Sequence, residues 1–428
     1  APPRLDETIT GVTARLPFGA MVAQLRHGDA HPPLDYLLRA PIARHSTAIW
    51  LLRLPSAAMS VAALVIFALW VRRFEIAGVV AVFLFAVSAF QLEAARQARM
   101  YAPLALVGLL GAVLTERWLI HGRRRDALCV GVVLTVGLFL HAATLLVAGG
   151  LIFIPGWRQD RRAWWWRGAI LGALGCWIAL WGPSFVDQQG PSNGAAYIPF
   201  ATPSRALSAV AELIVHSPDL DAVTVLVIAA GAIALVRRDR PIGRVWLCGF
   251  LLPAAMAAAI GTRAHLLIPK TLAFAFWAPC LAAGAAAGWI GTLPAPRILA
   301  ALPLVAFVVV PSTARAVVDV DQTSWSTASF APALDRLDDL VHTGDGVAAF
   351  PGQLVFPAEW HLSGPAAPRP LAVDIPSASA FLPKGRTWQG TLWLIEYPGS
   401  HATSDNWLPC GAPSERIEGY RISCLRHR

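Results

Sequence analysis

Ten apolar runs recur along this chain, and they restrict its fold more than any other feature of the sequence. The hydrocarbon core of a bilayer is about 30 Å thick, and roughly 20 helical residues cross it. The runs cover approximately 55–71, 76–91, 101–120, 127–141, 142–155, 168–185, 221–236, 245–260, 271–290 and 297–311. The stretch 127–155 fits either two short crossings or one bent helix. The sequence therefore predicts a mainly α fold, a polytopic transmembrane helical bundle of about ten spans.

The charge content excludes a water-soluble design. Only 14% of the 428 residues are charged, against about 25% in soluble domains, and the mean hydropathy is +0.54. The net charge of +9 does not require a nucleic-acid partner, because basic residues at the ends of membrane helices give the same total. We therefore expect membrane lipids, and no nucleic acid, around this chain.

Four arginine-dense loops set the expected orientation. With 127–155 counted as two crossings, all four fall on one side of the membrane, which the positive-inside rule assigns to the cytoplasm. These loops are 71–75, 121–126, 156–167 and 237–244. The opposite side receives the N-terminal stretch, 91–101, 186–220, 261–270 and everything after about 312. We expect a multi-pass protein of the plasma (inner) membrane whose active site and C-terminal domain are extracytoplasmic.

The composition changes near residue 312, which predicts three parts. They are a first extracytoplasmic loop with interfacial helices (1–54), a transmembrane module (55–311) and a small extracytoplasmic α/β domain (312–428). In the last part, 333–342 is typical of an amphipathic helix, and 346–350 and 391–397 are typical of strands. Cys410 and Cys424 lie there and can form a disulfide if the domain is exported. The sequence leaves that pairing open.

The outer segments are rich in side chains that can do chemistry. They are Asp6, Glu7, Asp29, His31, Glu93, Arg96, Arg99, Tyr101, His141, Arg263, His265 and Lys270. Each also has a structural interpretation: helix-capping acids, interfacial arginines, a packing histidine, or a lysine that anchors at the interface. Lys270 is one of only two lysines in the chain.

Five motifs carry a family resemblance over roughly the first 315 residues. They are "LDET" (5–8), "HPPLDYLL" (31–38), "LRLPSAAMSVAAL" (52–64), "ARQARMYAPLAL" (95–106) and "AYIPFATPSRALSAVAELI" (196–214). In this order and spacing they resemble the polytopic glycosyltransferases of the GT-C class, in the branch of the protein O-mannosyltransferases and aminoarabinose transferases. The resemblance implies transfer of a sugar from a polyprenyl-phosphate carrier to an acceptor hydroxyl, usually with inversion. It also implies one further span upstream of residue 1.

The resemblance assigns roles that agree with the chemistry. An attacking hydroxyl needs a base, and alignment with the family's acidic pair makes Asp6 that base, with Glu7 as its neighbour or substitute. The departing lipid phosphate is a stable anion and needs only cations and donors to hold it. The candidate phosphate ligands are Arg96, Arg99, Lys270, Arg263 and His31. The candidate substrate-binding residues are Asp29, Glu93, Tyr101, His141 and His265.

Two departures from the family pattern affect these roles. Some relatives have an arginine two residues after the acidic pair, where this chain has Ile9. Bacterial relatives often read Pro-Arg-Tyr where this chain reads "PKTL" (269–272), so Lys270 replaces an arginine as a point charge without bidentate geometry.

The sequence contains no metal-binding motif such as His-Glu-x-x-His or paired Cys-x-x-Cys. We expect no cofactor, while a divalent cation on Asp6, Glu7 and Asp29 is the minority alternative. The expected donor sugar is mannose or arabinose, and the expected acceptor is a cell-envelope glycan, glycolipid or protein. Two other functions stay open: a membrane transporter or lipid-carrier flippase, and a non-catalytic envelope assembly protein.

Overall fold

A computed structural model describes most of the chain in two compact units. The described residues are 5–28, 31–46, 48–155, 160–187, 200–214, 220–264, 267–291, 331–340, 346–350, 371–372, 392–396, 407–410, 415–417 and 420–427. The first unit comprises Ala1–Leu16, Arg39–Leu52 and Asp321–Arg428. The second comprises Pro17–Leu38 and Arg53–Val320. The three-part division expected from composition stays a prediction.

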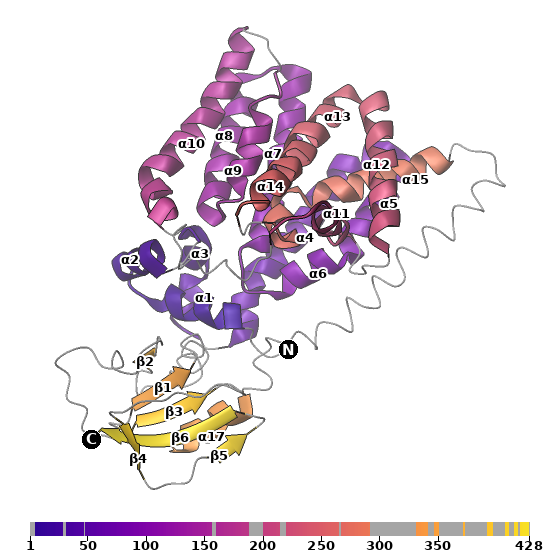
Figure 1. The fold of residues 1–428 in the computed structure, drawn as a ribbon. Coiled ribbons are helices and arrows are strands. Elements are labelled where there is room, and N and C mark those ends of the chain that lie inside the picture. Colours follow the sequence, from indigo (N-terminus) through magenta and orange to yellow (C-terminus); the bar gives the residue numbers. More distant parts are fainter. Residues whose placement is uncertain are drawn as a thin grey trace. The chain divides into compact units, whose positions relative to one another are not determined.

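The second unit is helical (Figure 1). Its elements, with two that continue into the first unit, are α2 (Phe18–Gly28), α3 (Leu34–Ala43), α4 (Ile49–Val71), η1 (Arg72–Phe74), α5 (Glu75–Val87), α6 (Ala89–Arg96), α7 (Tyr101–His121), α8 (Arg124–Leu140), α9 (Thr144–Leu151), α10 (Arg161–Asp187), α11 (Pro203–Ala211), α12 (Asp221–Arg238), α13 (Arg240–Trp246), η3 (Leu247–Leu251), α14 (Leu252–Gly261), η4 (Pro269–Ala275) and α15 (Trp277–Gly291). Helix α7 packs against α8, α8 against α10, and α15 against both α5 and α12.

Within the described residues, four helical stretches are long and apolar enough to cross a membrane. They are Ile49–Val87, Tyr101–His121, Arg161–Asp187 and Arg240–Gly261. The segments Pro269–Ala275 and Trp277–Trp289 meet at a bend of 71° and add a fifth if they form one broken span. The mainly α, multi-pass membrane fold is thus confirmed.

Within the described residues, fewer helices meet this length and hydropathy criterion than the ten apolar runs of the sequence. The runs 55–71 and 76–91 belong to one apolar stretch, and α8 and α9 have only 17 and 8 residues. Helix α12 has three charged residues, Asp221, Arg237 and Arg238. The run 297–311 lies outside the described residues.

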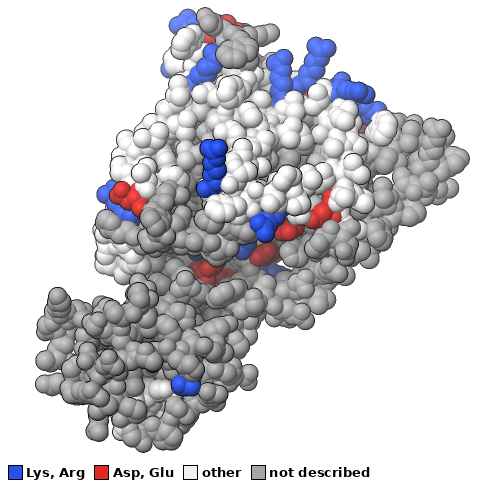
Figure 2. Space-filling model, viewed as in Figure 1, with Lys and Arg blue, Asp and Glu red and all other residues white. Residues whose placement is uncertain are grey.

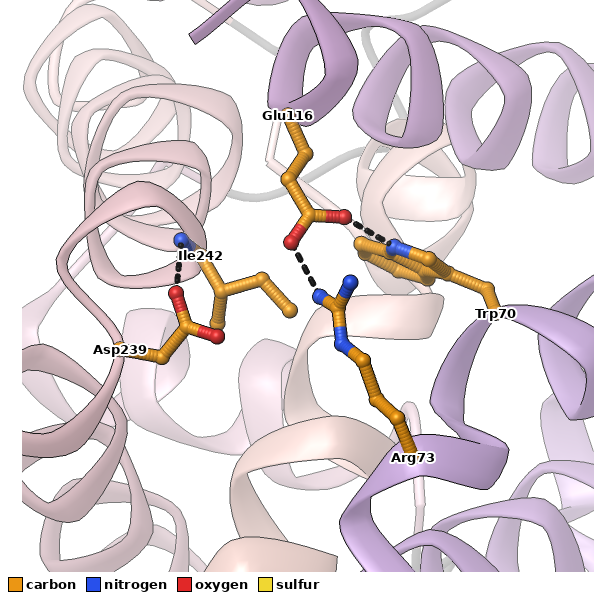
Figure 3. A network of polar contacts seen from close by, with 5 residues as sticks. All are labelled: Trp70, Arg73, Glu116, Asp239 and Ile242. Carbon is orange, nitrogen blue, oxygen red and sulfur yellow. Dashed lines mark hydrogen bonds and ion pairs between the residues drawn. The ribbon is translucent and has the colours of Figure 1, made fainter. Parts of the chain in front are cut away.

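The arginine-dense loops lie at one end of the second unit, as predicted. A Cβ on Gly122, between α7 and α8, would lie 2.7 Å from a guanidinium nitrogen of Arg162 at the start of α10. Near the same end of α7, the Glu116 carboxylate accepts a 2.7 Å hydrogen bond from the Trp70 indole N–H and pairs with Arg73. Figure 3 shows these groups near Asp239, whose carboxylate caps α13 by accepting from the N–H of Ile242.

The surface of the second unit changes from basic to apolar away from this end. In Figure 2 the upper end carries several Lys and Arg side chains, and the face below them is mostly uncharged. Large apolar side chains are exposed on this unit, including Val61, Val65, Ile76, Val79 and Leu226. In water such exposure is costly, whereas in a bilayer it is expected.

The C-terminal part of the first unit is a small α/β domain, as predicted. Helix α17 (Ala331–Leu340) packs against a six-stranded sheet. Its strands are β1 (Gly346–Phe350), β2 (Leu371–Ala372), β3 (Leu392–Glu396), β4 (Trp407–Pro409), β5 (Glu415–Ile417) and β6 (Tyr420–His427). The order is β2-β1-β3-β6-β4, with β5 also on β6. Strand β1 pairs parallel with β2 and β3, and β6 pairs antiparallel with its neighbours. Cys410 and Cys424 form a disulfide there.

Candidate active site

The acidic pair lies on the first turn of α1 (Leu5–Arg15), in the first unit. Carboxylates are favoured there by the helix dipole whether or not they are catalytic. The two side chains differ in access: Asp6 is exposed, whereas Glu7 is fully buried. An acceptor from outside can therefore reach Asp6 more readily than Glu7.

The helix α1 is held to the segment that follows α3. The Arg15 side chain donates a 2.9 Å hydrogen bond to the carbonyl of Ala43, and the Arg44 side chain donates a 3.0 Å bond to the carbonyl of Leu16. Arg39, which is fully buried, donates to the carbonyl of Leu52. Arg15 and Arg44 thus fix the helix that carries the acidic pair to the end of α3, and Arg39 fixes α3 to the start of α4.

In the second unit, Lys270 lies in a cluster of four side chains, three of which were predicted as site residues. The Lys270 ammonium lies 3.6 Å from a carboxylate oxygen of Glu93 and 5.4 Å from the centroid of the Tyr101 ring. The amide nitrogen of Gln97 donates a 2.6 Å hydrogen bond to the same oxygen of Glu93. We call Glu93, Gln97, Tyr101 and Lys270 the lysine cluster. It presents a cation beside an aromatic face.

Local packing explains why these residues meet. The Ser88 hydroxyl caps α6 by accepting from the N–H of Gln91 at 3.2 Å. The ring of Phe90 on α6 lies 5.2 Å from that of Phe276, which directly follows η4. Helix α7 approaches η4 closely at Gly108, where a Cβ would fall 1.6 Å from the carbonyl oxygen of Phe274. These contacts fix α6, α7 and η4 to one another.

The other predicted cations have different surroundings. Arg96, at the end of α6, and Arg263, after α14, are exposed. Arg99 is only 7% exposed, and its carbonyl accepts a 3.2 Å hydrogen bond from the Ser56 hydroxyl. Among the described residues, Lys270 contacts two other predicted site residues, Glu93 and Tyr101.

His31 and His141 lie together although they are distant in the sequence. Their ring centroids are 5.2 Å apart at an angle of 37°. His141 directly follows α8, and its Nδ1 accepts a 3.0 Å hydrogen bond from the N–H of Ala143. Because an N–H can only donate, Nδ1 of His141 is the acceptor in this bond.

Two predicted residues, Asp29 and His265, lie outside the described residues. The acidic pair belongs to one unit and the lysine cluster to the other, so their convergence around one cavity stays a prediction. Within the described part of the chain, no group of three or more His, Cys, Asp or Glu side chains could hold a metal ion.

Sequence reasoning missed Gln97 as a member of the site. Its spacing from Glu93 was a usable signal, because side chains four residues apart can meet on one face of a helical turn. The burial of Arg39 had no comparable signal, since its partner is a backbone carbonyl.

No family model matches the sequence, and no curated protein matches it in a sequence comparison. Solved structures do match. ArnT from Cupriavidus metallidurans in the apo state is 12% identical, with a TM-score of 0.59 over 99% of this chain and 93% of that chain. The same protein bound to undecaprenyl phosphate gives a TM-score of 0.63 over 98% and 92%.

A third similar structure is the archaeal oligosaccharyltransferase AglB from Archaeoglobus fulgidus, in complex with an inhibitory peptide and a dolichol-phosphate. It is 12% identical, with a TM-score of 0.57 over 92% of this chain and 66% of that chain. At identities this low, the structural likeness establishes a shared fold and no more. The likeness extends over nearly the whole chain and agrees with the motifs, so this protein has the fold of the GT-C membrane glycosyltransferases.

Proposed function

We propose that the protein is a membrane glycosyltransferase that moves a sugar, mannose or arabinose, from a polyprenyl-phosphate donor to a hydroxyl of a cell-envelope glycan, glycolipid or protein. The observation that carries the proposal is the fold shared with ArnT bound to undecaprenyl phosphate, over 98% of this chain. The lysine cluster supports it, because a partly exposed ammonium is suited to a lipid phosphate.

In the proposed reaction the acceptor oxygen attacks the anomeric carbon as the bond from that carbon to the phosphate oxygen breaks. The Asp6 carboxylate takes the hydroxyl proton, and polyprenyl phosphate leaves with the bonding electron pair. Inversion follows from a single displacement. The leaving phosphate needs no general acid, so Lys270, with Arg96 and Arg99, has only to hold charge.

The site is proposed to be extracytoplasmic. The arginine-dense loops lie at the end of α7 that contains Glu116, and the positive-inside rule assigns that end to the cytoplasm. Tyr101 of the lysine cluster begins α7, a helix of 21 residues whose other end is His121. A helix of this length is about 30 Å long, which matches the bilayer core.

Transfer of labelled sugar tests the proposal directly. The purified protein in detergent, given radiolabelled polyprenyl-phosphate mannose or arabinose and a membrane extract as acceptor, should transfer label in a time-dependent way. Transfer should persist in EDTA, because we propose that side-chain cations hold the phosphate and that no metal cofactor is needed. Loss of transfer in EDTA would instead favour a cation bound by the acidic loop. Movement of a carrier lipid across a liposome membrane, without transfer, would favour the flippase alternative.

The disulfide supplies an independent test of sidedness. Cys410 and Cys424 have Cα atoms 5.5 Å apart, and the Cys410 N–H donates to the Cys424 carbonyl at 3.1 Å. Disulfides persist in oxidising compartments, so the C-terminal domain should be exported. Denatured, unreduced protein purified from cells should react with a maleimide at four thiols, Cys129, Cys176, Cys248 and Cys280, and reduction should add two. The Cys410→Ser/Cys424→Ser variant should gain none. Six reactive thiols before reduction in the unsubstituted protein would contradict an exported domain.

A further inference from the structure

We propose that Glu93 is a charge gate on the phosphate site: it holds Lys270 before the donor binds and weakens retention of the spent carrier after transfer. The inference rests on the proposed function, in which Lys270 meets the donor phosphate. Its basis is the 3.6 Å contact between the Lys270 ammonium and a Glu93 carboxylate oxygen.

The contact joins two anchored elements. Glu93 lies on α6, and its oxygen is also held by the Gln97 amide at 2.6 Å. Lys270 lies on η4, which packs against α7. Packing of Phe90 against Phe276 ties the ends of α6 and η4 together. Glu93 therefore stays beside Lys270 when the lysine changes partner.

The pair is open to a competing anion. The Lys270 and Glu93 side chains are 32% and 35% exposed, so a phosphate can approach from outside the protein. Ion pairs this exposed are weak, and displacement of the carboxylate by a phosphate costs little. Once the phosphate is bound, the Glu93 carboxylate remains nearby as a like charge and lowers the affinity of the site for anions.

The charges of donor and product make this effect selective. The donor is a phosphodiester with one negative charge, whereas the released polyprenyl phosphate is a monoester with about −1.5 to −2 at pH 7. A fixed like charge repels the product more strongly than the donor, nearly in proportion to charge. Without Glu93, a site that holds the donor well would hold the product still better and remain blocked after each turnover.

The test compares product and donor affinities in the full-length protein. Glu93→Gln keeps an oxygen that can accept from Gln97 but removes the charge. It should tighten donor binding about threefold and undecaprenyl phosphate binding about five- to tenfold, the larger factor following from the larger charge. The readouts are the KM for the labelled donor and the inhibition constant of undecaprenyl phosphate. Glu93→Ala, a second variant, should shift both constants in the same direction. Glu75→Gln, which removes an exposed carboxylate within the arginine-dense loop 71–75, should change neither constant.

The outcomes separate this inference from the proposed function. Lys270→Gln should weaken binding of both lipids about tenfold or more, because it removes the phosphate ligand. Suppose that Lys270→Gln weakens binding of both lipids but that Glu93→Gln leaves the ratio of product affinity to donor affinity unchanged, or weakens binding of both lipids. The charge gate is then wrong, and the glycosyltransferase proposal stands. If Lys270→Gln changes neither affinity, the charge gate is also wrong, and the transfer assay alone decides the function.

Discussion

Alanine in place of Gly108 is expected to destabilise the folded protein by about 3 kcal/mol or more. A Cβ at this position on α7 would lie 1.6 Å from the Phe274 carbonyl oxygen, 2.5 Å from its carbonyl carbon and 2.8 Å from its Cα. All three are backbone atoms, so no change of side-chain rotamer relieves the clash. Either α7 or η4 must move, and because η4 carries Lys270, any protein that still folds should also bind polyprenyl phosphate less tightly.

Gly172 on α10 provides the matched control. A Cβ there meets nothing within 4 Å, and alanine in place of a helical glycine stabilises by about 0.5–1 kcal/mol through the lower entropy of the unfolded chain. Thermal unfolding of both variants in the same detergent should thus shift in opposite directions from the unsubstituted protein. A Gly108→Ala protein that unfolds with, or above, Gly172→Ala would refute the close approach of α7 and η4.

The sequence predicts the class of fold and the orientation of the loops because both depend on local features. Each apolar run indicates a helix that can face lipid, and each arginine-dense loop indicates one end of the helical bundle. The contact of Gly122 with Arg162 and the pairing of Arg73 with Glu116 confirm the common end. The resemblance to the GT-C class rests on short motifs in order, and the fold shared with ArnT agrees with it.

Other features could not be predicted because they depend on packing between distant segments. The runs 127–141 and 142–155 place a break at His141, but nothing in the second run marks how short α9 is. The 71° bend before α15 falls inside a run that predicts one straight span. The pairing of Lys270 with Glu93 joins segments far apart in the sequence, whereas the local pair of Glu93 and Gln97 could have been predicted from spacing.

Burial distinguishes the two residues of the acidic pair, which the sequence alone does not. In the sequence, Asp6 and Glu7 are adjacent carboxylates that could exchange roles, and only the family alignment favours Asp6. The structure makes them unlike, because Asp6 is exposed and Glu7 is fully buried. A base must reach an acceptor that arrives from outside, whereas a buried carboxylate is better suited to holding the surrounding backbone and side chains in place.

Replacement of Asp6 by asparagine should therefore reduce kcat for sugar transfer by about 10²- to 10⁴-fold, the range supplied by a positioned general base. Asparagine keeps the size and exposure of the side chain but cannot take the hydroxyl proton. Donor affinity should stay within about twofold of the unsubstituted value, because in the proposed mechanism Asp6 contacts the acceptor and not the phosphate. The measurement is the initial rate of label transfer at saturating donor, with donor KM taken from the same series.

Glu7→Gln and Glu75→Gln are the controls for the loss of kcat expected in Asp6→Asn. Glu75 is exposed in the first turn of α5 at the arginine-dense end, so its replacement should leave the rate unchanged and lower the free energy of unfolding by at most about 1 kcal/mol. Glu7 is buried, so its replacement should lower the free energy of unfolding by about 1–3 kcal/mol, with much less effect on kcat in the protein that stays folded. The reverse pattern, with transfer intact in Asp6→Asn and lost in a folded Glu7→Gln, would make Glu7 the base. It would also require the first turn of α1 to open before the acceptor binds, because a carboxylate without access to the acceptor cannot take its proton.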